Sequence, residues 1–205
     1  AKMGKNYIVE FGMRYQNPPI KNALLRLKEQ GVDEIKVIPM YPQWASSSTL
    51  SSIEKVKKEL KSIAYTPKID FVENFVDNKL FIQAFSDLGN KYWQTKNYEH
   101  VLFSFHGIPE RHVLNYSDGN YCKLGDCCKK YGSKNKLCYR AQCYQTARSI
   151  AAQMGLTDAQ YTVAFQSRLE TRAKDPWLKP YSDVVIADMP KNGIKNVLAF
   201  SASFV

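Results

Sequence analysis

The sequence contains no long hydrophobic run. No segment approaches the roughly 18 consecutive apolar residues that a membrane-spanning helix needs. Residues 1–5, Ala-Lys-Met-Gly-Lys, lead directly into an apolar segment without the pattern of a secretory signal peptide. We therefore expect a soluble, intracellular protein, located in the cytoplasm.

Acidic residues are comparatively few: 19 Asp and Glu stand against 29 Lys and Arg, which gives a net charge of +10. Such a balance is compatible with nucleic acid, an anionic membrane surface or an acidic small molecule as partner. The lysines are spread along the chain and are not interleaved with aromatic residues in a nucleic-acid-binding motif. We expect no nucleic-acid partner and leave peripheral association with a membrane open, along with the oligomeric state.

Cysteine is absent except in one short segment. The count is odd, the chain is long and no secretion signal is present, so metal ligands or free thiols are favoured over disulfides. Thiolates that share a metal must converge to about 2.3 Å from it, which short spacings make easy. Four of the five could hold a two-iron, two-sulfur (2Fe-2S) cluster or, as the alternative, a tetrahedral zinc. The five are Cys122, Cys127, Cys128, Cys138 and Cys143.

The rest of the chain alternates strand-like and helix-like segments, often with glycine after a helix. This alternation predicts an α/β fold with parallel sheets covered by helices on both faces. We expect one half at 1–97 and another at 98–205, each incomplete at its outer end, because the terminal segments resemble interrupted α/β units. The expected strands are 7–11, 34–40, 68–72, 101–105, 161–166 and 195–201, and the expected helices are 20–30, 49–63, 78–96, 141–154 and 181–192.

The carboxyl ends of parallel strands are where open α/β sheets bind ligands. In this sequence they would bring residues 39–48, His106, residues 166–168 and residues 201–205 to one rim. A cleft between the two halves is the expected active site. His106 stands out there, because it follows an apolar strand-like run directly.

Four segments together resemble the ferrochelatase family, in order and in approximate spacing, over essentially the whole chain. The resemblance is strong because the motifs are independent of one another. They are Phe103-Ser-Phe-His106-Gly-Ile-Pro109-Glu, Gly12-Met-Arg14-Tyr15-Gln-Asn17-Pro18, Tyr41-Pro-Gln-Trp44-Ala-Ser46-Ser47-Ser48-Thr49, and Phe165-Gln-Ser-Arg168 followed by Asp175-Pro-Trp177 through Asp183.

The resemblance implies two Rossmann-like halves and an enzyme, a lyase that inserts ferrous iron into protoporphyrin IX to give protoheme in the last step of heme biosynthesis. Coproporphyrin is the alternative substrate. The family's partner glutamate follows the position at which this chain stops, so the chain as given is expected to be impaired, as a piece of a longer protein. Two departures from the family pattern are the intervening residues 170–174 and the presence of Ala202 where the family often has proline.

By the same resemblance His106 is the essential catalytic histidine. It would act as the base that removes pyrrole protons or as a ligand to the incoming iron, since imidazole suits both roles. Arg14 would hold a propionate, a water chain or Glu10, and the hydroxyls from Ser46 onward would bind a carboxylate or cap the following helix. Apolar and aromatic walls suit a flat porphyrin; the porphyrin-binding candidates are Arg14, Tyr15, Tyr41, Ser46, Ser47, Trp177 and Phe204.

Several bacterial ferrochelatases carry a 2Fe-2S cluster held by four cysteines, some in an internal insertion, which here would be residues 120–143. The resemblance favours Cys122, Cys127, Cys128 and Cys138 as ligands, with Cys143 in reserve. The cluster would stabilise the protein or sense redox state. The alternative function is a non-catalytic porphyrin- or heme-binding protein with an iron–sulfur sensing role, which would bind porphyrin without inserting metal.

Overall fold

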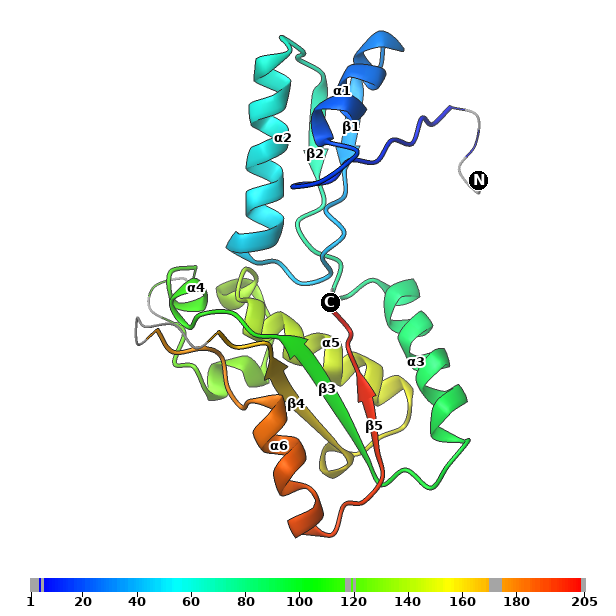
Figure 1. Ribbon diagram of the computed structural model, residues 1–205, viewed down its shortest axis with the longest axis vertical. Helices are drawn as coiled ribbons and strands as arrows, with labels where there is room; N and C mark the ends of the chain where they lie inside the picture. Colours follow the sequence, from blue (N-terminus) through cyan, green and yellow to red (C-terminus); the bar gives the residue numbers. More distant parts are fainter. Residues whose placement is uncertain (1–3, 5, 117–118, 120, 170–174, 204–205) are drawn as a thin grey trace. The chain divides into compact units, whose positions relative to one another are not determined.

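Figure 1 shows the computed structural model, which describes residues 4, 6–116, 119, 121–169 and 175–203. The chain forms two compact units: Ala1–Met40 with Ser46–Glu73, and Tyr41–Ala45 with Asn74–Val205. The predicted boundary at residues 97 and 98 therefore differs from the division in the structure. The helix that precedes this boundary packs on a later helix of the second unit, which explains the difference.

The first unit contains α1 (Ile20–Glu29), β1 (Glu34–Val37), α2 (Ser51–Ser62) and β2 (Lys68–Phe71), with a π-helical turn at Ser46–Leu50 before α2. β1 and β2 pair in parallel, with Ile35 opposite Ile69. Apolar residues at helical spacing on α1 face this small sheet. The core of the unit consists of Ile20, Leu24, Leu27, Ile35, Val56 and Leu60.

The second unit is built on three parallel strands in the order β4-β3-β5, which are Tyr161–Gln166, His100–His106 and Val197–Phe200. Its helices are α3 (Lys79–Trp93), α4 (Arg111–Leu114), α5 (Tyr139–Gln153) and α6 (Ser182–Asp188). The alternating side chains of β3 pack on both sides: Phe103 and Phe105 lie in the cluster with α5, while Leu102 packs with Met189 beyond α6. Figure 1 shows α5 and α6 on opposite faces of this sheet. The prediction of an α/β fold with parallel sheets between helices is confirmed.

Local structure departs from the sequence prediction in several places. Residues 7–11 form no strand, and the side chains of Tyr7, Val9 and Phe11 are exposed, because an alternating pattern forms a strand only where another strand pairs with it. β1 ends at Val37, before Pro39, which lacks the N–H for further pairing. The helix expected at 181–192 ends at Asp188 and continues as a 3₁₀ turn at Pro190–Asn192.

The cysteine-rich segment between α4 and α5 folds into short turns, with 3₁₀ helices at Asp126–Lys129 and Ser133–Asn135. A further 3₁₀ turn at Asp158–Gln160 leads into β4. None of the helices in the described part of the chain is long and apolar enough to cross a membrane.

Candidate active site

His106 is the last residue of β3, the middle strand of the three-stranded sheet. Parallel pairing sets it opposite Gln166, the last residue of β4, and the Gly107 N–H donates to the Gln166 carbonyl over 2.7 Å. The side chain is half-buried, and this burial lowers the pKa of His106 below its ordinary value of 6.5. At neutral pH the imidazole is therefore held mainly in its neutral form, which can accept a proton or bind a metal ion.

The loop after His106 is fixed by a second chain segment. The Glu110 N–H donates to the Pro176 carbonyl at 2.8 Å, and the Leu178 N–H donates to the Ile108 carbonyl at 3.0 Å. These bonds bring Trp177 against Gly107: a Cβ built on Gly107 would lie 3.4 Å from Trp177 Cε3 and 2.8 Å from the Gln166 carbonyl. A glycine is required at this position because any side chain would meet the backbone of β4.

Trp177 lies beside the histidine loop with its indole nitrogen buried. No hydrogen-bond partner of Nε1 is found among the described residues. Trp177 is one of the porphyrin-binding residues predicted from the sequence. The structure brings it to the residue that follows His106, while its predicted role stays a prediction.

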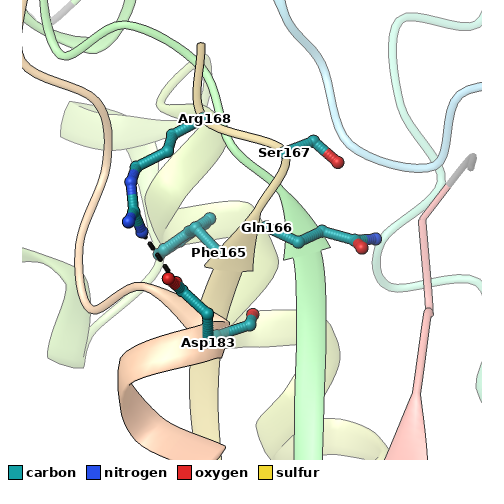
Figure 2. Close-up of a pocket in the computed structure, with 6 residues that line it drawn as sticks. Phe165, Gln166, Ser167, Arg168 and Asp183 are labelled. Carbon is teal, nitrogen blue, oxygen red and sulfur yellow. Dashed lines mark hydrogen bonds and ion pairs between the residues drawn. The ribbon is translucent and has the colours of Figure 1, made fainter. Parts of the chain in front are cut away.

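A pocket of about 350 Å³ opens at the carboxyl end of β4. Figure 2 shows Arg168 turned toward Asp183, and their ion pair measures 2.7 Å. The Arg168 guanidinium also lies 4.2 Å from the centre of the Tyr181 ring. The lining residues are Phe165, Gln166, Ser167, Arg168, Ser182 and Asp183.

Residues 166–168 were predicted on this rim, whereas Ser182 and Asp183 were not predicted to line it. They come from the start of α6, and Ser182 shares a hydrogen bond of 2.8 Å with Ser104 of β3. The segment Tyr181-Ser182-Asp183 was part of the family-like motif, and this was the signal that could have identified them.

Two of the predicted binding residues in the first unit, Arg14 and Tyr15, lie together. The Arg14 Nε donates to Ser51 Oγ at 3.1 Å, and its guanidinium lies 4.5 Å from the centre of the exposed Tyr15 ring. Of the three alternatives for Arg14, a propionate, a water chain or Glu10, the structure does not show the last, because Glu10 pairs with Arg26 at 2.6 Å.

Ser46 and Ser47 begin the π-helical turn before α2, and no side chain caps the start of α2. The hydroxyls of Ser48 and Thr49 are buried without a hydrogen-bond partner among the described residues. The expectation that these hydroxyls cap the helix is therefore wrong, because the π-helical turn runs directly into α2.

Tyr41 belongs with His106 and Trp177 in the second unit and is half-buried. Phe204, the remaining aromatic residue predicted to bind porphyrin, lies outside the residues that the structure describes.

Four of the five cysteine thiols make a series of neighbouring contacts. Cys122 contacts Cys127, the Cys127 and Cys128 sulfurs are 4.0 Å apart, and Cys128 hydrogen-bonds with Cys138. The hydrogen bond with Cys138, together with the Arg140 guanidinium, lowers the pKa of Cys128 to about 6. Cys143 is fully buried, and that burial raises the pKa of its thiol well above the ordinary value.

This arrangement is not a preformed metal centre. Within the described parts of the chain, no three or more His, Cys, Asp or Glu side chains are grouped so that they could hold a metal ion. The sulfur donors suit a cluster or zinc in their chemistry but do not converge on one point. The expectation of a formed four-cysteine site is not met by the structure.

A set of buried polar residues on α5 was not predicted from the sequence. The Tyr139 hydroxyl donates to the His106 carbonyl at 2.8 Å, and Gln142 Oε1 accepts from the Trp44 N–H at 2.6 Å. Their spacing, with Thr146 further along, sets them on one face of the helix. The helical spacing of Tyr139, Gln142 and Thr146 was the available signal.

The fold and this rim define an α/β protein with a half-buried histidine at the carboxyl edge of a parallel sheet. A family model described as Ferrochelatase matches residues 1–205, so the chain belongs to the ferrochelatase family.

Curated relatives agree with this assignment. Ferrochelatase of Legionella pneumophila (strain Paris) is 40% identical over 205 residues, which is 100% of this chain and 59% of the relative. Ferrochelatase of Pseudomonas fluorescens (strain SBW25) is 37% identical over 96% of this chain and 58% of the relative. Ferrochelatase of Coxiella burnetii (strain Dugway 5J108-111) is 36% identical over 98% of this chain and 55% of the relative. The chain thus spans less than two thirds of the length of these relatives.

Proposed function

We propose that this chain serves the insertion of ferrous iron into protoporphyrin IX, a lyase reaction of heme biosynthesis. Two pyrrole N–H bonds break, the four ring nitrogens bind the iron, and two protons are released. Membership of the ferrochelatase family supports this proposal, and the position of His106 carries it within the molecule.

His106 suits the reaction because partial burial lowers its pKa. A neutral imidazole can take a pyrrole proton or bind ferrous iron, and both actions are lost when it is protonated. The His106 carbonyl and the Gly107 N–H belong to one peptide group, and both are hydrogen-bonded, to Tyr139 and to Gln166, so the imidazole starts from a defined position. Trp177, next to Gly107, offers an aromatic surface of the kind that a flat macrocycle contacts.

The test is an anaerobic assay of ferrous iron insertion into protoporphyrin IX, followed by the change in porphyrin absorbance. The 205-residue chain is compared with a version extended beyond Val205 by the corresponding segment of the Legionella pneumophila relative, each with and without His106→Ala. We expect heme formation by the extended protein and a loss of at least about 100-fold with His106→Ala. His100→Ala serves as the matched control, because His100 lies at the opposite end of β3.

Porphyrin binding without metal insertion by the extended protein would contradict the proposal and favour the binding or sensing alternative. A parallel assay with coproporphyrin identifies the preferred substrate. The net charge of +10 supports weak attraction to anionic lipid, which co-sedimentation with anionic vesicles would test. The cytoplasmic location stays a prediction.

We further propose that the cysteine-rich segment binds a 2Fe-2S cluster after a local rearrangement, with Cys122, Cys127, Cys128 and Cys138 as ligands. The series of sulfur contacts supports the proposal, because it keeps the four thiols close together in a segment of short turns. Zinc is the alternative occupant.

Anaerobic reconstitution with iron and sulfide tests the cluster through the visible absorption spectrum and analysis of bound iron and sulfide. Cys128→Ser is expected to abolish binding, while Cys143→Ser keeps it. Equal loss in both variants, or zinc retained in place of iron, would contradict the assignment.

A further inference from the structure

Helix α5 carries three buried polar side chains on one face. Tyr139, Gln142 and Thr146 are 2%, 0% and 0% exposed, and their spacing aligns them along the helix. Other buried positions of the helix are apolar, including Ala147 and Ile150. Burying a polar group is unfavourable unless a hydrogen bond compensates, so the partners of these side chains indicate what the polar face does.

Tyr139 reaches the end of β3. Its hydroxyl donates to the His106 carbonyl at 2.8 Å, whereas the pairing of β5 with β3 ends earlier, at Phe103 and Phe200. The strand end that carries the histidine is therefore held by β4 through Gly107 and by α5 through Tyr139.

Gln142 holds a different segment. Its Oε1 accepts from the Trp44 N–H at 2.6 Å, and its Nε2 donates to the Lys136 carbonyl. Trp44 belongs to Tyr41–Ala45, the short segment that folds with the second unit although its neighbours in sequence belong to the first. Tyr41, a predicted porphyrin-binding residue, is part of this segment.

A second pair supports the same segment. Gln43, 2% exposed, donates from Nε2 to Thr146 Oγ1 and to the Ala202 carbonyl, both at 3.0 Å. One face of α5 thus binds the segment Tyr41–Ala45 through the Trp44 N–H and the Gln43 side chain. The same face binds the His106 carbonyl through the Tyr139 hydroxyl.

We propose that Tyr139 and Gln142 are positioning residues with separate tasks in the proposed reaction: Tyr139 orients His106, and Gln142 fixes the Tyr41–Ala45 segment. This inference rests on the proposed function for its chemical consequence. Orientation of a reacting group acts mainly on the rate of the chemical step, while placement of a binding segment acts on substrate affinity.

The first measurement is independent of activity. Hydrogen exchange by mass spectrometry is compared in peptides that cover residues 41–45 and 103–108 in otherwise unaltered protein. Tyr139→Phe is expected to increase exchange in 103–108 by about tenfold and to leave 41–45 unchanged. Gln142→Met is expected to increase exchange in 41–45 and to leave 103–108 unchanged, because the Trp44 N–H loses its acceptor.

Matched variants control for the loss of a hydroxyl or an amide alone. Tyr161→Phe removes a hydroxyl that binds Asp158 at the other end of the sheet. Gln145→Met removes an amide that bonds to Arg148 and Ser149 within α5. Both are expected to leave exchange in the two peptides unchanged. Gln142→Glu retains an oxygen for the Trp44 N–H and should protect 41–45 better than Gln142→Met does.

The second measurement uses the extended protein of the insertion assay. Tyr139→Phe should lower kcat about tenfold with little change in KM for porphyrin, and Gln142→Met should raise KM about tenfold with a smaller change in kcat. Porphyrin affinity from fluorescence quenching should follow the KM values.

Equal effects of both variants on the two peptides, or on kcat and KM together, would overturn the proposal and indicate general destabilisation. Selective exchange effects in a protein that neither binds nor metalates porphyrin would refute the proposed function instead, while supporting the separate holding of the two segments.

Discussion

β3 of the second unit and β1 of the first are both parallel strands, but they differ in burial. Five of the seven residues of β3 (His100–His106) are buried, and Phe103 and Phe105 are fully buried. In β1 only Ile35 is buried, and its neighbours Glu34 and Lys36 are exposed. The candidate histidine thus ends the better-packed strand, which suits a group that must keep its position during a reaction.

The largest test of this difference compares core truncations. Phe103→Ala should lower the free energy of unfolding by about 3–5 kcal/mol, because Phe103 stacks on Phe200 and contacts Tyr161. Ile35→Ala should cost about 2–3 kcal/mol. Urea unfolding is followed by tryptophan fluorescence and by far-UV circular dichroism.

The two probes separate the units. All three tryptophans, Trp44, Trp93 and Trp177, belong to the second unit. Phe103→Ala should therefore shift the fluorescence midpoint, whereas Ile35→Ala should shift only the circular dichroism transition. An equal fluorescence shift in both variants would show that the units unfold as one.

A smaller effect is expected at the loop after β3. Gly107→Ala should destabilise the protein by about 1–3 kcal/mol, because its new methyl group would lie 2.8 Å from the Gln166 carbonyl. Gly132→Ala has open space around it and should change stability by less than about 0.5 kcal/mol. Thermal unfolding checks both, and similar losses would contradict the steric explanation.

Acid should affect the second unit through its histidines, all three of which lie there. Burial lowers the pKa of His100 below its ordinary 6.5. As the pH falls, His100 is therefore protonated in the unfolded chain before it is protonated in the folded one. The contribution of neutral His100 to the stability of the folded protein is fully present above about pH 6.5 and is lost as the pH falls through the lowered pKa of His100.

His100→Gln should consequently reduce the loss of stability between pH 7.5 and pH 5.5, measured by urea unfolding followed by fluorescence. Glutamine can keep a hydrogen bond to Thr162, which His100 Nε2 contacts at 2.9 Å. If the variant keeps the same pH dependence of stability, other titratable groups cause that dependence.

The smallest effect is expected on the exposed face of β1 and β2. Glu34 and Lys68 lie opposite each other with a contact of 3.0 Å, and both are largely exposed. Glu34→Gln should cost roughly 0.2–1 kcal/mol at low salt, and less in high salt because exposed charges are screened. A larger loss of stability that does not depend on salt, measured by circular dichroism, would contradict the expectation that this surface ion pair contributes little to the stability of the first unit.

Sequence patterns predicted the helices and strands whose formation depends on residues close by in the sequence. The apolar run at 101–105 predicted a buried strand, which the structure extends to His100–His106, and the spacing of Ile20, Leu24 and Leu27 predicted α1. The segment 7–11 misled because strand formation depends on a partner that the pattern does not contain. α4 was missed because it is only one short turn between loops.

The candidate site was predictable where family-like motifs marked it and not where distant partners define it. His106 and Trp177 were selected from such motifs, and the structure brings Trp177 against the residue after His106. The roles of Gln43 and Gln142 depend on partners 98 to 159 residues away, so no local pattern could reveal them. The sulfur contacts likewise depend on how the turns of the cysteine-rich segment fold.

The short segment Tyr41–Ala45 has a consequence for synthesis on the ribosome. Trp44 is made 98 residues before Gln142, the side chain that accepts its N–H. At about 5–20 residues per second, the segment waits roughly 5–20 seconds for its partner. Residues on either side of it can begin to form the first unit in that interval, while Gln43 and Trp44 stay without their final hydrogen bonds. The nascent chain therefore exposes this segment to chaperones until α5 has emerged.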